Sequence, residues 1–122
     1  MKVKLIIGNL GFDAAHNLYD YEGDCARLHG HSYKLSVVIE GEVNSEGFVL
    51  DFGTAREIIK QNIIYKYEHR YLNDMFDFNP TAENMARCFA KILDSEFSKY
   101  DGVRLSALKL WETEHNCVEI IW

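Results

Sequence analysis

Hydrophobic and polar residues alternate along two stretches in the first third of the chain. An extended backbone places every second side chain on the same face, so strict alternation is typical of a half-buried strand. The apolar series of the first stretch is Leu10, Phe12 and Ala14, and it ends at His16. The second series is Tyr33, Leu35, Val37 and Ile39. The pattern predicts one strand that ends at His16 and a second strand that ends near Gly41.

The middle of the chain changes to a helical period. Asp51 as an N-cap, or Thr54 in a capping box, can begin a helix that runs over about residues 53–67. Asn79-Pro80-Thr81 is a second start signal, and the helix it begins is expected to end near Asp101-Gly102. Apolar residues recur at helical spacing in this second segment, at Ala82, Met85, Ala86, Phe89, Leu93 and Phe97.

Alternation returns in the last twenty residues and predicts two more strands. Residues 103–107 alternate, and residues 108–111 continue with the parity slipped by one, which predicts a β-bulge. Residues 117–122 form the last strand. The order strand, strand, helix, helix, strand, strand favours an α+β fold, with an antiparallel four-stranded sheet and both helices on one face. We expect a single domain over residues 1–122.

Composition narrows the classes of partner and compartment. The net charge is −6, and the Lys and Arg residues are scattered, which argues against a nucleic-acid partner. No apolar run is long enough for a membrane span, and the N-terminus lacks the apolar core of a signal peptide, so we expect a cytoplasmic protein. Three cysteines are an odd and sparse set, typical of free thiols in a reducing compartment. Cys88 and Cys117 are expected in the core.

A histidine cluster is the strongest chemical signal in the sequence. His29-Gly30-His31 in an extended segment would point both imidazoles to one face, about 7 Å apart. Gly30 lets a neighbouring segment approach, and His16, at the end of the preceding predicted strand, is the natural third ligand. Three imidazoles suit Zn²⁺ and leave one open coordination position, which favours a catalytic site over a structural one. A chance grouping of three surface or core histidines is the alternative.

Cys25 stands four residues before His29 and admits three interpretations. A thiolate ligand would close the zinc site and make it structural. A thiolate beside an open zinc site could instead accept a substrate proton as a general base. The third interpretation is an ordinary buried cysteine.

Six segments in order along nearly the whole chain resemble the family of 6-pyruvoyltetrahydropterin synthase and 6-carboxy-5,6,7,8-tetrahydropterin synthase. Phe12-Asp13-Ala14-Ala15-His16 and the segment from Cys25 to His31 are similar to its paired zinc motifs. The other four segments are Gly47–Phe52, Glu68–Asp74, Asn79–Asn84 and Trp111–Thr113. At Glu68 the family usually has Asp, so this acid stands one methylene further out.

The resemblance implies a T-fold subunit that assembles as a trimer or hexamer, with active sites at subunit boundaries. It implies that His16, His29 and His31 bind one Zn²⁺ per chain and that Cys25 is the general base. It further implies that His69 and Glu68 form a proton relay reaching the site of an adjacent subunit. The substrate-binding residues it implies are Glu112, which would hold the N–H edge of the pterin ring, and Thr81 and Thr113.

The resemblance also orders the candidate reactions. The Cys25-x-x-x-His29-Gly30-His31 form is most similar to the branch that converts 7,8-dihydroneopterin triphosphate to 6-carboxy-5,6,7,8-tetrahydropterin, with loss of triphosphate and acetaldehyde, for queuosine. The pyruvoyl branch, which eliminates triphosphate for biopterin, is the second candidate. A further branch has Glu in place of Cys25 and forms hydroxymethyldihydropterin; Asp24 is the one feature here that fits it. From another class, the chain could be a non-catalytic pterin- or purine-binding subunit with a structural zinc.

Overall fold

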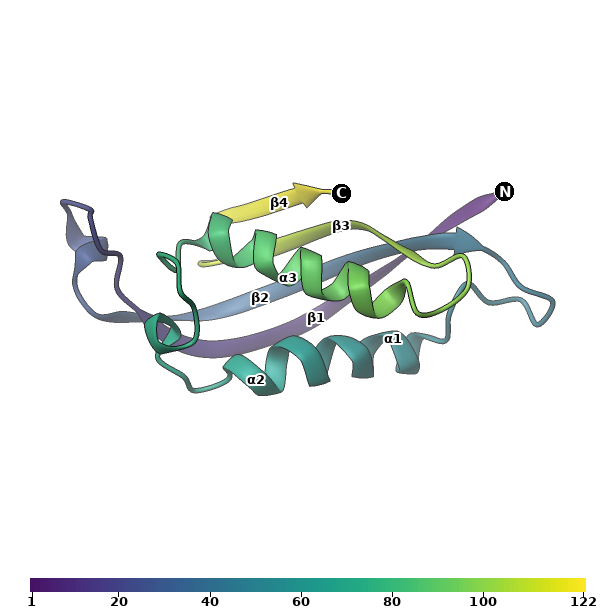
Figure 1. Cartoon of the computed structure of the whole chain (residues 1–122), viewed down its shortest axis with the longest axis horizontal. Helices are drawn as coiled ribbons and strands as arrows, with labels where there is room; N and C mark the ends of the chain where they lie inside the picture. Colours follow the sequence, from purple (N-terminus) through teal and green to yellow (C-terminus); the bar gives the residue numbers. More distant parts are fainter.

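The computed structural model covers residues 1–122 and is built on one antiparallel sheet with the strand order β1-β2-β3-β4 (Figure 1). The strands are β1 (Lys2–His16), β2 (His29–Glu42), β3 (Arg104–Trp111) and β4 (Cys117–Ile121). The predicted α+β class and the order of its elements are confirmed. Both of the first strands are longer than the alternating stretches predicted.

Two β-bulges interrupt the alternation of buried and exposed side chains along the strands. In β1 the register against β2 shifts between Ile7 and Leu10, where Asn9 has a φ of 57°. The extra residue changes the parity of the buried side chains, and this hid the first half of β1. The predicted bulge in β3 is present, since Val38 pairs with Ala107 whereas the next residue of β2 pairs with Leu105.

The first helical stretch matches its predicted range but contains an unpredicted π-helical turn. It comprises α1 (Phe52–Ile59), the π-helical turn η2 (Lys60–Ile64) and α2 (Tyr65–Tyr67). Of the two predicted caps, Asp51 is the one used, because its Oδ1 accepts the Thr54 N–H at 3.1 Å. The second helix, α3 (Ala82–Phe97), is capped by Thr81 and ends before the predicted Asp101-Gly102.

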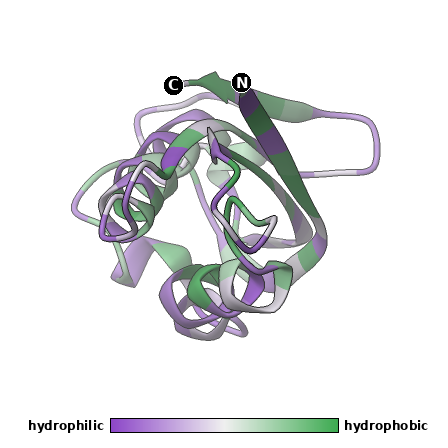
Figure 2. Cartoon of the chain, turned by 90° about the vertical axis from the view of Figure 1, so that its right-hand side faces the viewer, coloured by the Kyte–Doolittle hydropathy of each residue, from purple (hydrophilic) through white to green (hydrophobic).

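The helices cover one face of the curved sheet, and the core lies between the two layers (Figures 1 and 2). On the sheet side the core includes Phe12 and Tyr33, whose rings stack with centroids 5.0 Å apart, and on the helix side it includes Phe89. Cys88 is half-buried, and the expectation that Cys117 is in the core is wrong. Cys117 begins the short edge strand β4 with its side chain exposed. No helix combines the length and the apolar character that crossing a membrane requires.

The end of the sheet where β1 stops and β2 starts is the part that matters for function. The β1–β2 loop, residues 17–28, projects from this end and contains the 3-10 turn η1 (Asp24–Ala26) (Figure 1). The connection from α2 to α3, residues 68–81, reaches the same end and contains the 3-10 turn η3 (Leu72–Asp74). Side chains from strands, loop and connection therefore meet there.

Candidate metal centre and active site

Three histidines meet at this end of the sheet, as the sequence predicted. His16 is the last residue of β1 and pairs in register with His29, the first residue of β2, while His31 pairs with Ala14. One potential ligand atom from each histidine lies within 4.8 Å of those of the other two. The ring centroids are 4.6–5.1 Å apart. Strand pairing alone therefore brings together three imidazoles that are up to 15 residues apart in sequence.

Backbone carbonyls fix which nitrogen of two of these rings carries the proton. His16 Nδ1 lies 2.8 Å from the carbonyl oxygen of Pro80, and His29 Nδ1 lies 2.7 Å from that of Arg27. A carbonyl can only accept, so each neutral ring carries its hydrogen on Nδ1 and presents a lone pair on Nε2. This is the arrangement that holds metal-binding histidines in proteins, because it sets both the tautomer and the ring orientation.

The positions of the Nε2 atoms are better explained by a shared cation than by hydrogen bonds between the rings. His16 Nε2 and His29 Nε2 are 3.0 Å apart, and both are acceptors in these tautomers. His31 Nε2 is buried and has no hydrogen-bond partner. A buried nitrogen without a partner is costly, and metal coordination removes this cost. Tetrahedral zinc with Zn–N bonds of about 2.0–2.1 Å separates its nitrogens by roughly 3.3 Å, close to the 3.0 Å between the Nε2 atoms of His16 and His29.

Burial keeps two of the three imidazoles neutral. Desolvation lowers the pKa of His16 below its usual value, although the Pro80 hydrogen bond and the charge of Glu112 oppose the shift. Desolvation also lowers the pKa of His31, again against the Glu112 charge. Neutral imidazole is the metal-binding form, so the fold prepares this site for a cation near neutral pH.

Glu112 is the acidic group next to the three rings. It follows β3, and its carboxylate oxygens lie 3.6 Å from His31 Nε2 and 3.9 Å from His16 Nε2. Glu112 also lines a hollow of about 1050 Å³, together with His31, Glu68 and the outward-facing Asp13 and Lys34. A carboxylate that borders both a hollow and a cluster of Nε2 atoms can hold one part of a ligand while another part reaches the metal position.

Cys25 lies in η1 and is half-buried. Its carbonyl accepts the Leu18 N–H at 2.8 Å, which ties η1 to the chain two residues beyond His16. The group of ligand atoms within 4.8 Å of one another contains the three histidines and does not contain the Cys25 sulfur. The geometry places this thiol on the loop that joins the two histidine-bearing strand ends.

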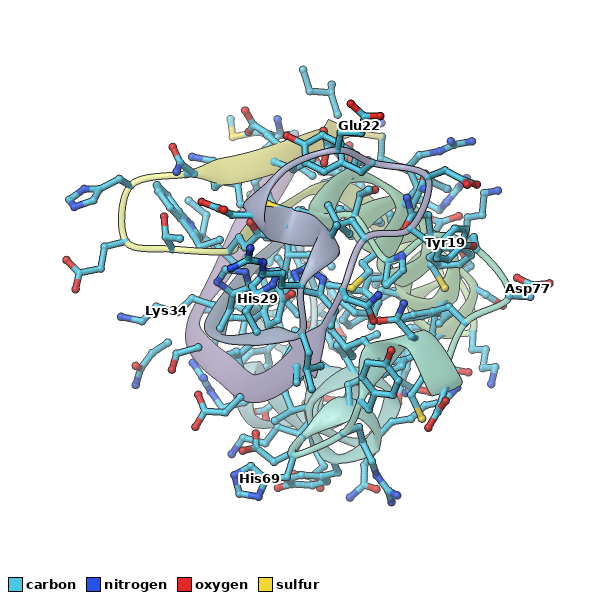
Figure 3. The ribbon with its side chains drawn as sticks, turned by 90° about the vertical axis from the view of Figure 1, so that its left-hand side faces the viewer. Tyr19, Glu22, His29, Lys34, His69 and Asp77 are labelled. Carbon is cyan, nitrogen blue, oxygen red and sulfur yellow. The ribbon has the colours of Figure 1, made fainter.

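Glu68 and His69 form a second, separate group. Glu68 Oε1 lies 3.0 Å from His69 Nε2, and Asp13 completes a set of three within 4.8 Å. The His69 N–H donates to the Asp13 carbonyl at 2.7 Å, with His69 at a φ of 56°. The His69 side chain is 77% exposed and points outward at the lower edge of Figure 3, whereas His29 lies near the centre. The two groups of ligand atoms are thus separate, although Glu68 lines the same hollow as His31 and Glu112, and His69 lines a second hollow with His31.

The two predicted threonines already have structural partners. Thr81 caps α3 by accepting the Asn84 N–H at 3.1 Å. Thr113 Oγ1 accepts the N–H groups of His115 and Asn116, both at 3.2 Å, in the β3–β4 turn. Neither of these bonds prevents the hydroxyl from donating to a ligand.

Sequence reasoning missed the groups that support the histidines. Tyr33 is buried, and its hydroxyl lies 3.2 Å from His16 Nδ1. Its parity, two residues after His31, was a usable signal. The Pro80 carbonyl is 64 residues from His16, and nothing local in the sequence indicates that contact.

Two curated relatives are similar to this chain over most of its length. The chain is 35% identical over 122 residues to the dihydroneopterin monophosphate aldolase of Pyrococcus furiosus, and the match covers all of both chains. It is 30% identical over 127 aligned residues to the 6-carboxy-5,6,7,8-tetrahydropterin synthase of Haemophilus influenzae, covering 84% of this chain and 87% of that protein.

The fold has a close match among solved structures. The 6-pyruvoyl tetrahydropterin synthase of Caenorhabditis elegans superposes with a TM-score of 0.85 and 24% identity, over 100% of this chain and 96% of that one. The sheet with its two helices is thus the T-fold that the sequence predicted. The family model described as 6-pyruvoyl tetrahydropterin synthase matches residues 6–121, and the chain belongs to that family.

Proposed function

We propose that this protein is a zinc-dependent lyase that acts on the side chain of phosphorylated 7,8-dihydroneopterin and forms 6-carboxy-5,6,7,8-tetrahydropterin. The observation that carries the proposal is the convergence of three imidazoles beside the carboxylate of Glu112, two of them with an Nε2 lone pair set by a carbonyl hydrogen bond to Nδ1. Three histidines leave zinc one open position, as catalytic sites do. A bound zinc ion would polarise the side-chain oxygens of the substrate and acidify the neighbouring protons.

Glu112 holds the pterin ring in this proposal. The ring edge presents adjacent N–H donors, which a carboxylate can accept in pairs. Because the carboxylate lies 3.6 Å from His31 Nε2, a ring bound there has its side chain beside the histidines. A substrate bound at Glu112 therefore reacts at the histidines without moving. Holding its side chain in place in this way accelerates the reaction.

Cys25 serves as the general base. It is half-buried in the loop between the strand ends that carry His16 and His29, and its sulfur is outside the group of ligand atoms. A thiol on this loop could accept a carbon-bound proton from a substrate bound at the histidines. The three histidines alone complete the protein's share of the coordination.

Glu68 and His69 act on the site of a neighbouring copy of the chain. The His69 side chain is exposed and lies 3.0 Å from its carboxylate partner Glu68, so the pair is accessible to a neighbouring subunit. β4 is an edge strand whose outer side is unpaired, so association of subunits in a trimer or hexamer would also cover this edge.

A second candidate is cleavage of the monophosphate by an aldolase reaction. Two observations favour it: the full-length match to the P. furiosus aldolase, and the charge of the hollow. The hollow is lined by one cation, Lys34, and by four carboxylates, Asp13, Glu68, Glu112 and Glu114. Such a lining suits a monophosphate better than a triphosphate. Asp24, next to Cys25, offers a carboxylate base for this reaction.

Product analysis tests the proposal directly. Zinc-loaded protein is incubated separately with dihydroneopterin triphosphate and monophosphate, and the pterins are identified by mass spectrometry. We expect the carboxy product from the triphosphate. The pyruvoyl product would contradict that choice, and hydroxymethyldihydropterin from the monophosphate would establish the aldolase. No conversion of either substrate, with zinc bound, would support a non-catalytic binding subunit.

The Cys25→Ala variant separates a base from a ligand. Zinc content should stay at the wild-type level, while turnover falls by roughly 10²- to 10⁴-fold, as for loss of a general base. Asp24→Asn is the matched control and should retain most activity. If Cys25→Ala loses zinc and turnover together, Cys25 is a zinc ligand. If Asp24→Asn loses turnover and Cys25→Ala retains it, Asp24 is the base.

The metal-free protein should lose stability as the pH falls. Burial lowers the pKa of His16 and His31 in the folded state. Between pH 7.5 and 5.5 the unfolded chain therefore binds more protons than the folded chain, which lowers the free energy of unfolding. The thermal unfolding midpoint should therefore fall across this range, and the fall should be smaller in His31→Gln. A midpoint that is constant or rises on acidification would contradict the neutral, buried assignment.

Mixing inactive variants tests the shared site. Cys25→Ala and His69→Ala subunits, each inactive alone, should regain activity after exchange, because some boundaries then combine an intact base with an intact His69. Mixing Cys25→Ala with His29→Ala is the control and should restore nothing, since both changes affect the same half of the site. Failure of the first mixture despite proven exchange would place Cys25 and His69 in one subunit's site.

A further inference from the structure

The backbone of the segment that follows β1 forms hydrogen bonds with two asparagine side chains instead of with a neighbouring strand. The N–H of Asn17 donates to Asn73 Oδ1 at 3.0 Å, and Asn73 Nδ2 donates to the carbonyl of Asn17 at 2.8 Å. Two residues on, the N–H of Tyr19 donates to Asn79 Oδ1 at 3.2 Å, and Asn79 Nδ2 donates back to the carbonyl of Tyr19 at 3.0 Å. Each amide thus satisfies both backbone groups of one residue.

The residue between these two pairs faces the other way. The Leu18 N–H donates to the Cys25 carbonyl at 2.8 Å. The segment 17–19 is consequently held by asparagines along one side and by η1 along the other. Figure 3 shows Tyr19 on the side of the molecule where Asp77 lies, in the connection that supplies both asparagines.

This connection is itself anchored. Thr81 caps α3, and the Asn84 side chain donates to the Asn79 carbonyl at 3.0 Å. The next carbonyl, that of Pro80, accepts from His16 Nδ1 at 2.8 Å. One rigid segment therefore orients a histidine of the metal centre and also holds the loop that carries Cys25.

The loop has few other means of staying ordered. None of residues 17–28 is buried, so no core contact fixes the loop. An exposed segment of this length loses conformational entropy when it is ordered, and hydrogen bonds from an anchored partner offset that loss. The two amide pairs supply four such bonds, all from side chains that the sequence places more than 50 residues away.

We propose that Asn73 and Asn79 are positioning residues, which set the Cys25 loop relative to the three histidines by pairing with the backbone of Asn17 and Tyr19. The proposal rests on the proposed function in that Cys25 is the group being positioned. Displacing a reacting group by about 1 Å can cost up to roughly 10²-fold in rate, so the effect should appear in kcat.

Asn73→Asp and Asn79→Asp test the proposal, because a carboxylate keeps the shape and the acceptor but has no N–H to donate. Asn62→Asp is the matched control, since Asn62 Nδ2 donates to the Ile58 carbonyl within the helical stretch, away from the loop. Four quantities are compared in the zinc-loaded protein: zinc content, amide hydrogen exchange over residues 17–28, the alkylation rate of each cysteine by peptide mapping, and kcat with KM.

In both test variants we expect unchanged zinc, exchange in the loop faster by about tenfold or more, and Cys25 alkylated several times faster. The exposed Cys117 should react at the wild-type rate and serves as the internal reference. The kcat should fall about 10- to 100-fold with little change in KM. Asn62→Asp should match the wild type in all four.

Wild-type exchange and Cys25 alkylation in both test variants would overturn the proposal, and so would a loosened loop with wild-type kcat. Loss of zinc in step with kcat would also overturn it, because the asparagines would then support the metal and not the base. Lack of turnover in the wild-type protein would overturn the proposed function instead. The exchange and alkylation rates would still decide whether the asparagines hold the loop.

Discussion

The antiparallel register of β1 against β2 sets His16 opposite His29 and Ala14 opposite His31, and the candidate metal centre depends on it. The core enforces this register, because Phe12 and Tyr33 are paired, buried and stacked on the helix side of the sheet. A slip of one residue would move every side chain of one strand to the other face and would separate the imidazoles. The core thus fixes the site as well as the fold.

Burying the polar imidazoles costs free energy, and only some of their nitrogens have hydrogen-bond partners that offset this cost. Two Nδ1 atoms find carbonyl partners, from Pro80 and Arg27, while His31 Nε2 finds none within the chain. The three histidines each offer a potential ligand atom within 4.8 Å of the other two. A cation bound between these atoms would relieve the repulsion between the lone pairs and the cost of the orphan nitrogen together, so metal binding and stability are coupled here.

How far the sequence predicts the site depends on whether the signal is local. His29-Gly30-His31 and the parity of His16 are local, and the structure brings these three together as predicted. The Pro80 carbonyl and the amides of Asn73 and Asn79 reach the site from more than 50 residues away, and no period or motif indicates those contacts. The alternating pattern predicts only the second half of β1, because the bulge at Asn9 changes which of the odd and even positions are buried.

Zinc K-edge X-ray absorption reports the ligands of the ion in solution without reference to turnover, so it distinguishes an open three-histidine site from a closed site with a thiolate ligand. Binding by His16, His29 and His31 should give a shell of nitrogen and oxygen atoms at about 2.0–2.1 Å, with imidazole scattering from three histidines and no sulfur. The Cys25→Ala protein should give the same spectrum. A sulfur shell at about 2.3 Å that disappears in Cys25→Ala would instead make Cys25 a ligand of a closed, structural site and would rule out its role as the general base.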